Sequence, residues 1–244
     1  KWDSLCKRKK YSKEDSFLAG TITPDNINNN GDIRMRLTSV QRMDVTDLLI
    51  GDGDVLDKVL TSDIEKLRYT LECVDRAAFD AATDALIRAK HIYIMGVRSS
   101  SVLARFLNFN LRMIFDDVKL VQTTSGSEMF EQIHHIGEGD VLVAISFPRY
   151  SKRIIKAVEY AKGVGAQVIS ITDSDRSPIA PLADQLLIAR SDMVSFVDSL
   201  VAPLSIINAM IVSVARKDPA TVRTKLQKLE QIWEEYEVYD TASN

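Results

Sequence analysis

The chain has 244 residues, and its 31 Lys and Arg against 34 Asp and Glu give a formal net charge of −3 at pH 7. With 45% hydrophobic and 27% charged residues, the composition is that of an ordinary globular protein, and it excludes a disordered or collagen-like chain. The near-neutral charge also excludes a protein that is basic throughout, so any contact with nucleic acid must be local.

The N-terminal part differs in character from the rest. The first 37 residues carry a basic cluster from Lys7 to Lys13 and an Asn-rich turn at 28–31, and few of their apolar positions recur at helical or strand spacing. We interpret residues 1–52 as a polar and basic segment, a remnant or an incomplete part of a DNA-binding region. The basic cluster is typical of a solvated tail, with a contact to nucleic acid as the alternative.

From residue 53 the pattern becomes helical. Asp54 or Asp57 is expected to cap a first helix, and Asp75 to start a second. Five short apolar runs follow, at 92–97, 118–121, 141–145, 168–171 and 185–189. Segments with apolar residues at helical spacing separate them, and the segment before the fifth run is 179–183. Such runs are typical of parallel strands that are covered on both faces.

The predicted fold is therefore α/β. We expect a doubly wound, flavodoxin-like parallel sheet of five strands with helices on both faces and a helical lead-in. Residues 199–215 carry no charge, but the stretch is too short and too polar for a membrane span, so a buried core helix without membrane contact is expected. An amphipathic helix across 221–239 should pack on the domain or on a second subunit.

The loops after the first three strands are rich in hydroxyl groups. Ligands of open parallel sheets bind beyond the carboxyl ends of the strands, and a hydroxyl-rich turn at a helix N-terminus favours an anion. Any one serine could merely cap a helix, but three equivalent loops predict a phosphate site. No dinucleotide or P-loop motif occurs, so the ligand should be a small phosphorylated molecule. The candidate residues are Arg98, Ser99, Ser100, Ser101, Thr123, Thr124, Ser125, Ser146, Arg149 and Ser151.

The sequence IYIMGVRSSSVLA at 92–104, followed by the segments 146–151 and 168–173, resembles the sugar isomerase (SIS) domain. More closely, residues 53–240 resemble the effector domain of the RpiR/MurR family of bacterial transcriptional regulators. The resemblance implies a phosphosugar effector that modulates operator binding through a preceding helix-turn-helix module. It also implies that Ser99 and Ser100 bind phosphate, and that Ser146 and Ser151 supply hydroxyls. Arg98 replaces a Gly of many members, and Phe147-Pro148-Arg149 replaces the middle of the usual loop.

Glu128 completes the candidate set and carries the main alternative. SIS isomerases use a carboxylate from about this part of the fold, so the chain could be an aldose–ketose phosphosugar isomerase. Another alternative is a phosphosugar-binding module without a DNA partner. A carboxylate at a helix start is also ordinary, and we expect ligand binding rather than catalysis. Cys6 and Cys73 show no zinc or disulfide spacing, so we expect no metal site and a cytoplasmic protein. We also expect no cofactor, and a homodimer or homotetramer.

Overall fold

The computed structural model describes residues 37–51, 53–122, 125–192 and 197–239. The basic cluster at Lys7 to Lys13 and the candidates Thr123 and Thr124 lie outside these residues.

The centre of the structure is a parallel sheet of five strands in the order β2-β1-β3-β4-β5. The chain leaves β1 for β2 on one side and returns to place β3 on the other, so the order reverses between β1 and β3. The predicted doubly wound, flavodoxin-like sheet is therefore confirmed. The strands are β1 (Ile92–Gly96), β2 (Val118–Val121), β3 (Val141–Ile145), β4 (Gln167–Thr172) and β5 (Gln185–Ile188).

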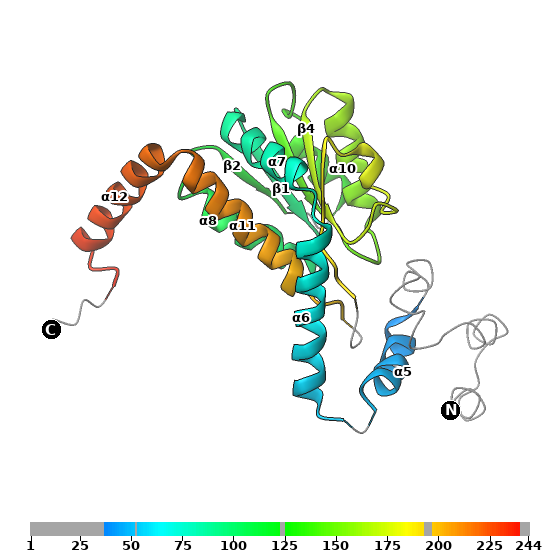
Figure 1. The fold of residues 1–244 in the computed structure, drawn as a ribbon. Coiled ribbons are helices and arrows are strands. Elements are labelled where there is room, and N and C mark those ends of the chain that lie inside the picture. Colours follow the sequence, from blue (N-terminus) through cyan, green and yellow to red (C-terminus); the bar gives the residue numbers. More distant parts are fainter. Residues whose placement is uncertain (1–36, 52, 123–124, 193–196, 240–244) are drawn as a thin grey trace, which may run out of the picture.

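Helices cover both faces of this sheet (Figure 1). Side chains alternate along each strand, so Ile92 and Ile94 of β1 join one hydrophobic cluster while Tyr93 and Met95 join the other. The first cluster is closed by α7 (Arg76–Arg88), α8 (Ser100–Leu111) and α11 (Val201–Lys217), and the second by α9 (Gly126–Ile133) and α10 (Lys152–Gly163). Burial on both faces explains why the strands have apolar sequences with little polar alternation.

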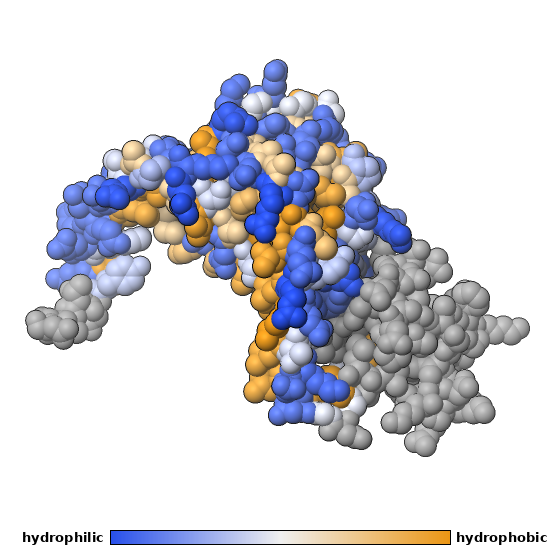
Figure 2. Space-filling model, in the orientation of Figure 1, coloured by the Kyte–Doolittle hydropathy of each residue, from blue (hydrophilic) through white to orange (hydrophobic). Residues whose placement is uncertain are grey.

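The helical lead-in begins where the sequence predicts it. Asp54 accepts hydrogen bonds from the first turn of α6 (Val55–Cys73), and Asp75 does the same for α7. These carboxylates satisfy amide groups that have no partner within a helix. One face of α6 leaves large apolar side chains in solvent, and Figure 2 shows this apolar band along the helix.

The crossover from β4 to β5 differs from the others. Only a single 3₁₀ turn, η1 (Ala180–Leu182), forms in the segment 179–183, where the spacing suggested a helix. Pro181 lies inside this turn and Pro178 precedes it; because proline has no amide hydrogen, a longer helix would lose hydrogen bonds at both positions.

Two further helices lie at the ends of the described chain. Within the segment 1–52, α5 (Ser39–Ile50) forms beside the domain, and α12 (Pro219–Glu235) projects from the end of α11 (Figure 1). The buried contact of α12 with the core is made by Val222 near its start. The uncharged stretch 199–215 lies mainly in α11, whose buried side chains join the first hydrophobic cluster, as expected of a core helix. Among the described helices, none has the length and apolarity to cross a membrane.

Candidate functional site

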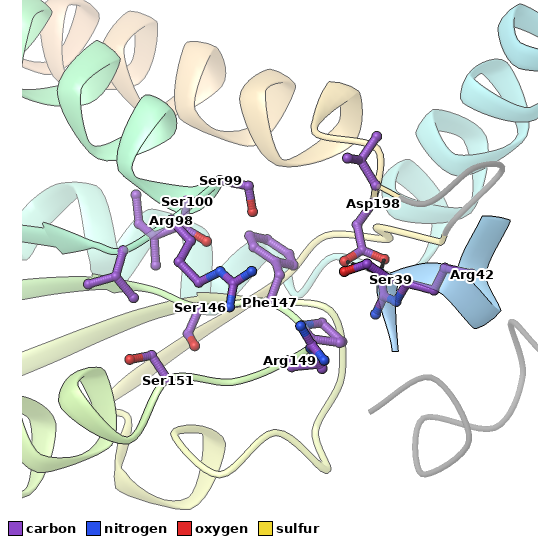
Figure 3. A pocket seen from close by; sticks show the side chains of 14 residues that line it. Ser39, Arg42, Arg98, Ser99, Ser100, Ser146, Phe147, Arg149, Ser151 and Asp198 are labelled. Atoms are coloured by element: carbon purple, nitrogen blue, oxygen red, sulfur yellow. Dashed lines mark hydrogen bonds and ion pairs between the residues drawn. The ribbon is translucent and has the colours of Figure 1, made fainter. Parts of the chain in front are cut away.

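A pocket of about 340 Å³ opens at the carboxyl ends of β1 and β3, where the strand order reverses. This is the place at which open parallel sheets bind ligands, and the volume lies within the roughly 300–1,000 Å³ usual for small-molecule sites. Figure 3 shows the side chains around it. The lining residues are Ser39, Arg42, Val97, Arg98, Ser99, Ser100, Ile145, Ser146, Phe147, Pro148, Arg149, Ser151, Val197 and Asp198.

The loop after β1 is held close to the following helix. A Cβ atom on Gly96 would lie 2.4 Å from the Ser100 carbonyl oxygen, so only glycine lets α8 begin so near the strand. Arg98 adopts a left-handed conformation with φ of 56°, and its carbonyl accepts bonds from the Ser101 amide at 3.0 Å and the Ser101 hydroxyl at 2.6 Å. Glycine adopts this conformation more readily than other residues, which explains why many members of the family that the sequence resembles have Gly at this position.

The loop after β3 forms the facing wall. The Ser146 amide donates to the Ile171 carbonyl at 3.1 Å, which fixes the end of β3 against β4. Phe147 is 5% exposed and packs into the first hydrophobic cluster, and it also lines the pocket. Ser151 both lines the pocket and caps α10, since its hydroxyl oxygen accepts a bond from the Arg153 amide at 3.2 Å.

Helix capping accounts for some of these serines and not for others. Ser125 caps α9, because its hydroxyl oxygen accepts a bond from the Glu128 amide at 3.2 Å. Ser99 stands at the N-cap of α8, but its hydroxyl makes no capping bond. Ser100 begins the same helix and is buried against the pocket. Capping therefore does not explain why hydroxyls gather after β1.

The structure brings together six of the candidate residues on the pocket wall. They are Arg98, Ser99, Ser100, Ser146, Arg149 and Ser151. Ser101, Ser125 and Glu128 are not among the described lining residues. Ser101 is engaged with the loop backbone, and Ser125 and Glu128 form the start of α9.

Sequence reasoning missed the outer wall of the pocket. Ser39 and Arg42 come from α5, and Val197 and Asp198 precede α11. One Arg42 guanidinium nitrogen, Nη1, lies 3.3 Å from each Asp198 carboxylate oxygen, and both side chains are less than a tenth exposed. The two residues are 156 positions apart, and no local pattern in the sequence links them.

The charges and dipoles around the pocket favour an anion. Among the described lining residues, Arg42, Arg98 and Arg149 stand against one carboxylate, that of Asp198. The N-termini of α8 and α10 begin at the wall, where helix dipoles and free amides attract negative charge. Within the described ranges, no cluster of three or more His, Cys, Asp or Glu could hold a metal ion.

Comparison with known sequences agrees with this geometry. Residues 85–213 match the family model of the SIS domain. A curated relative, an uncharacterised HTH-type transcriptional regulator from Clostridium perfringens strain 13, is 28% identical over 131 residues, which cover 54% of this chain and 46% of the relative. The chain spans about half the length of the first curated relatives that it matches.

Solved structures show the same architecture. The sugar isomerase domain of the RpiR transcription factor from Sphaerobacter thermophilus is 27% identical and has a TM-score of 0.69, covering 72% of this chain and 98% of that one. The NanR protein of Vibrio vulnificus, solved in complex with ManNAc-6P, has a TM-score of 0.68 at 20% identity, covering 96% and 97%. The chain thus belongs to the SIS-domain family, and its resemblance to the RpiR-type transcriptional regulators is confirmed.

Proposed function

We propose that the chain is the effector-sensing part of a transcriptional regulator and that it binds a sugar phosphate in the pocket at the ends of β1 and β3. The observation that carries this proposal is that four serines and two arginines from the loops after β1 and β3 line one pocket, beside two helix N-termini. Hydroxyl and guanidinium donors without a metal suit a phosphate group. Ser101, Ser125 and Glu128 do not line the described pocket, and Thr123 and Thr124, which lie outside the described residues, stay candidates for binding the sugar phosphate.

The partner that this proposal implies is operator DNA. The C. perfringens relative is named as an HTH-type regulator, and the chain spans about half its length. We propose that residues 1–52 are a remnant or an incomplete part of the DNA-binding region and that 53–240 form the SIS domain. Removing residues 1–36 should leave a domain that folds and binds sugar phosphate, because the described pocket residues begin at Ser39. Loss of cooperative unfolding after this deletion would mean that residues 1–36 are an integral part of the domain.

The observed site favours sensing over catalysis. A general base must lie within hydrogen-bond reach of the proton that it removes. Glu128 is not among the described pocket residues, and the carboxylate that does line the pocket, Asp198, is paired with Arg42. His134 and His135 stack on each other at the far end of α9. We therefore propose a non-enzymatic regulator rather than an aldose–ketose isomerase.

We further propose that the chain works in the cytoplasm as a homodimer. Helix α6 exposes Leu56, Leu60, Ile64 and Leu71, each more than half exposed and spaced four or seven residues apart on one face (Figure 2). The band continues into an apolar groove of about 450 Å³ between α6, α7 and α11. Monomeric proteins seldom leave so continuous an apolar surface in water, and a second copy offers a matching one.

Thermal unfolding with a panel of sugars tests the proposed function. Glucose 6-phosphate, fructose 6-phosphate and N-acetylmannosamine 6-phosphate are each compared with the unphosphorylated sugar. A ligand at about 100 times its Kd stabilises the folded state by about 2.7 kcal/mol, so the matching sugar phosphate should raise the melting temperature and its free sugar should not. Interconversion of an aldose and a ketose phosphate by the purified chain, abolished by Glu128→Gln, would instead establish the isomerase.

A further inference from the structure

We propose that helix α5 is part of the effector site, where Arg42 and Asp198 form an outer subsite for the sugar hydroxyls, so that a bound sugar phosphate fixes α5 on the domain. This inference rests on the proposed function and adds to it the route by which the ligand acts on the N-terminal segment. This outer subsite comes from α5 and from the segment before α11, whereas the serine loops after β1 and β3 form the rest of the pocket.

The pocket has two chemically different ends (Figure 3). Arg98, Ser100, Ser146 and Ser151 gather at the inner end, beside the strands and the helix N-termini. Ser39, Arg42 and Asp198 lie at the outer end, with Phe147 and Arg149 between the two. A phosphate suits the inner end because it meets donors there. Sugar hydroxyls suit the outer end, because a carboxylate accepts strong hydrogen bonds from them.

The start of α5 has a defined geometry at this outer end. The Thr38 amide donates to the Gln41 side-chain oxygen at 2.8 Å, and the Gln41 amide donates to the Thr38 hydroxyl at 3.2 Å. This reciprocal pattern is a capping box, which fixes where a helix begins. It places Ser39 and Arg42, on the first turn, at the pocket.

Helix α5 has a buried side and an exposed side. Val45 in the helix and Leu37 just before it are fully buried, whereas Val40 is 62% and Met43 is 47% exposed. On the buried face, Arg42 reaches Asp198, a residue just before α11. The ion pair therefore joins the N-terminal segment to the SIS domain at a point that a ligand in the pocket contacts directly.

The expected coupling follows from this arrangement. A molecule that contacts both the serine loops and the α5 wall binds more tightly when α5 is docked. By thermodynamic reciprocity, its binding must then favour the docked position by the same factor. Inorganic phosphate reaches only the inner end, so it should occupy the serine loops without favouring docking. A sugar phosphate should therefore favour the docked position of α5, and inorganic phosphate should not, although both carry the phosphate group.

The test uses the full chain and three variants. Arg42→Gln removes the guanidinium, Arg42→Gln with Asp198→Asn removes both charges together, and Met43→Gln changes an exposed neighbour on the same helix as a control. The double variant is needed because a buried carboxylate without its partner is destabilising in itself. The probes are inorganic phosphate and whichever of the three sugar phosphates named above stabilises the wild type most.

Two measurements are made on each protein. Calorimetry gives the dissociation constant, and amide hydrogen exchange reports the protection of residues 38–50. In both Arg42 variants we expect sugar phosphate affinity to fall about tenfold or more, while affinity for inorganic phosphate changes by less than about threefold. In the wild type and in Met43→Gln, sugar phosphate should slow exchange in α5, and inorganic phosphate should not.

The outcomes separate the two proposals. If no sugar phosphate stabilises the wild type, the proposed function fails and this inference fails with it. If a sugar phosphate binds the wild type but leaves exchange in α5 unchanged, or binds the double variant as tightly, the effector site exists and the role of α5 is refuted. Equal losses for sugar phosphate and inorganic phosphate would also refute it, because Arg42 would then belong to the phosphate end.

Discussion

Ser146→Ala is the most direct probe of the inner end of the pocket. Ser146 is 2% exposed and lines the pocket where β3 ends, and its amide is held by the Ile171 carbonyl. Alanine keeps this backbone bond and nearly the same volume, so the fold should be retained. Ser174→Ala is a matched control, because Ser174 follows the adjacent strand β4 but is not among the lining residues.

The size of the effect follows from the bond that is lost. A hydrogen bond from a hydroxyl to a charged group contributes about 1.5–3 kcal/mol, which corresponds to roughly a 10- to 100-fold weaker Kd. Isothermal titration calorimetry with a sugar phosphate and its free sugar, on wild type and both variants, measures this loss. Ser146→Ala should weaken binding of the phosphorylated sugar and leave that of the free sugar nearly unchanged, and Ser174→Ala should affect neither.

Two results would refute this reasoning. An equal loss for the phosphorylated and the free sugar would mean that Ser146 contacts the sugar, so the loop after β3 would not be the phosphate site. An unchanged affinity for both would mean that the ligand binds elsewhere. A lower melting temperature of Ser146→Ala without ligand would show instead that the hydroxyl supports the fold.

Three further predictions concern the scaffold. Gly96→Ala should destabilise the protein by about 1–3 kcal/mol in urea unfolding, because the new Cβ would overlap the backbone at the start of α8. The control Gly163→Ala, whose Cβ would meet nothing within 4 Å, should be neutral or slightly stabilising. Equal effects of the two variants would contradict the close approach of α8 to Gly96. A hydrogen bond from Lys217 at 2.7 Å lowers the pKa of Asp84 below its ordinary value of 3.8. Because the folded-state pKa of Asp84 is depressed, the stabilisation by Lys217 is present above pH 3.8 and is lost as the pH falls further. The difference in unfolding free energy between wild type and Lys217→Met should therefore narrow in acid. A difference that stays constant with pH would contradict this role of the Asp84–Lys217 bond. Ile64→Glu, at a position 55% exposed in the apolar band of α6, should shift the chain from dimer to monomer in light scattering, and an unchanged mass would place the contact elsewhere.

Much of the fold could be predicted from the sequence because its determinants are local. The runs 118–121 and 141–145 match β2 and β3 residue for residue. The central strand β3 is buried at every position and therefore carries only apolar side chains, whereas the edge strand β2 tolerates the exposed Lys119. Asp54 and Asp75 cap the helices where the pattern places them, because a cap acts within three residues of itself. The crossover at 179–183 was the exception, where two prolines outweigh the helical spacing.

The candidate site was predictable only in part. Ser99, Ser100 and Ser146 could be identified because the carboxyl ends of parallel strands meet at one edge, so strand order alone brings their loops together. The same rule also selected Ser101 and Ser125, whose hydroxyls are engaged with nearby backbone groups. Sequence does not distinguish a serine that caps a helix from one that faces a ligand, since both stand at a helix N-terminus.

The sequence by itself thus determined the parallel sheet, its helices and the edge at which an anion would bind. Only the tertiary structure decided what closes the pocket. Arg42 lies in the segment 1–52, which we interpreted as a polar and basic remnant of a DNA-binding region, yet it meets Asp198 across 156 residues and places α5 at the outer end of the site. Such a contact depends on how two distant segments pack, and it leaves no periodicity or motif in either one.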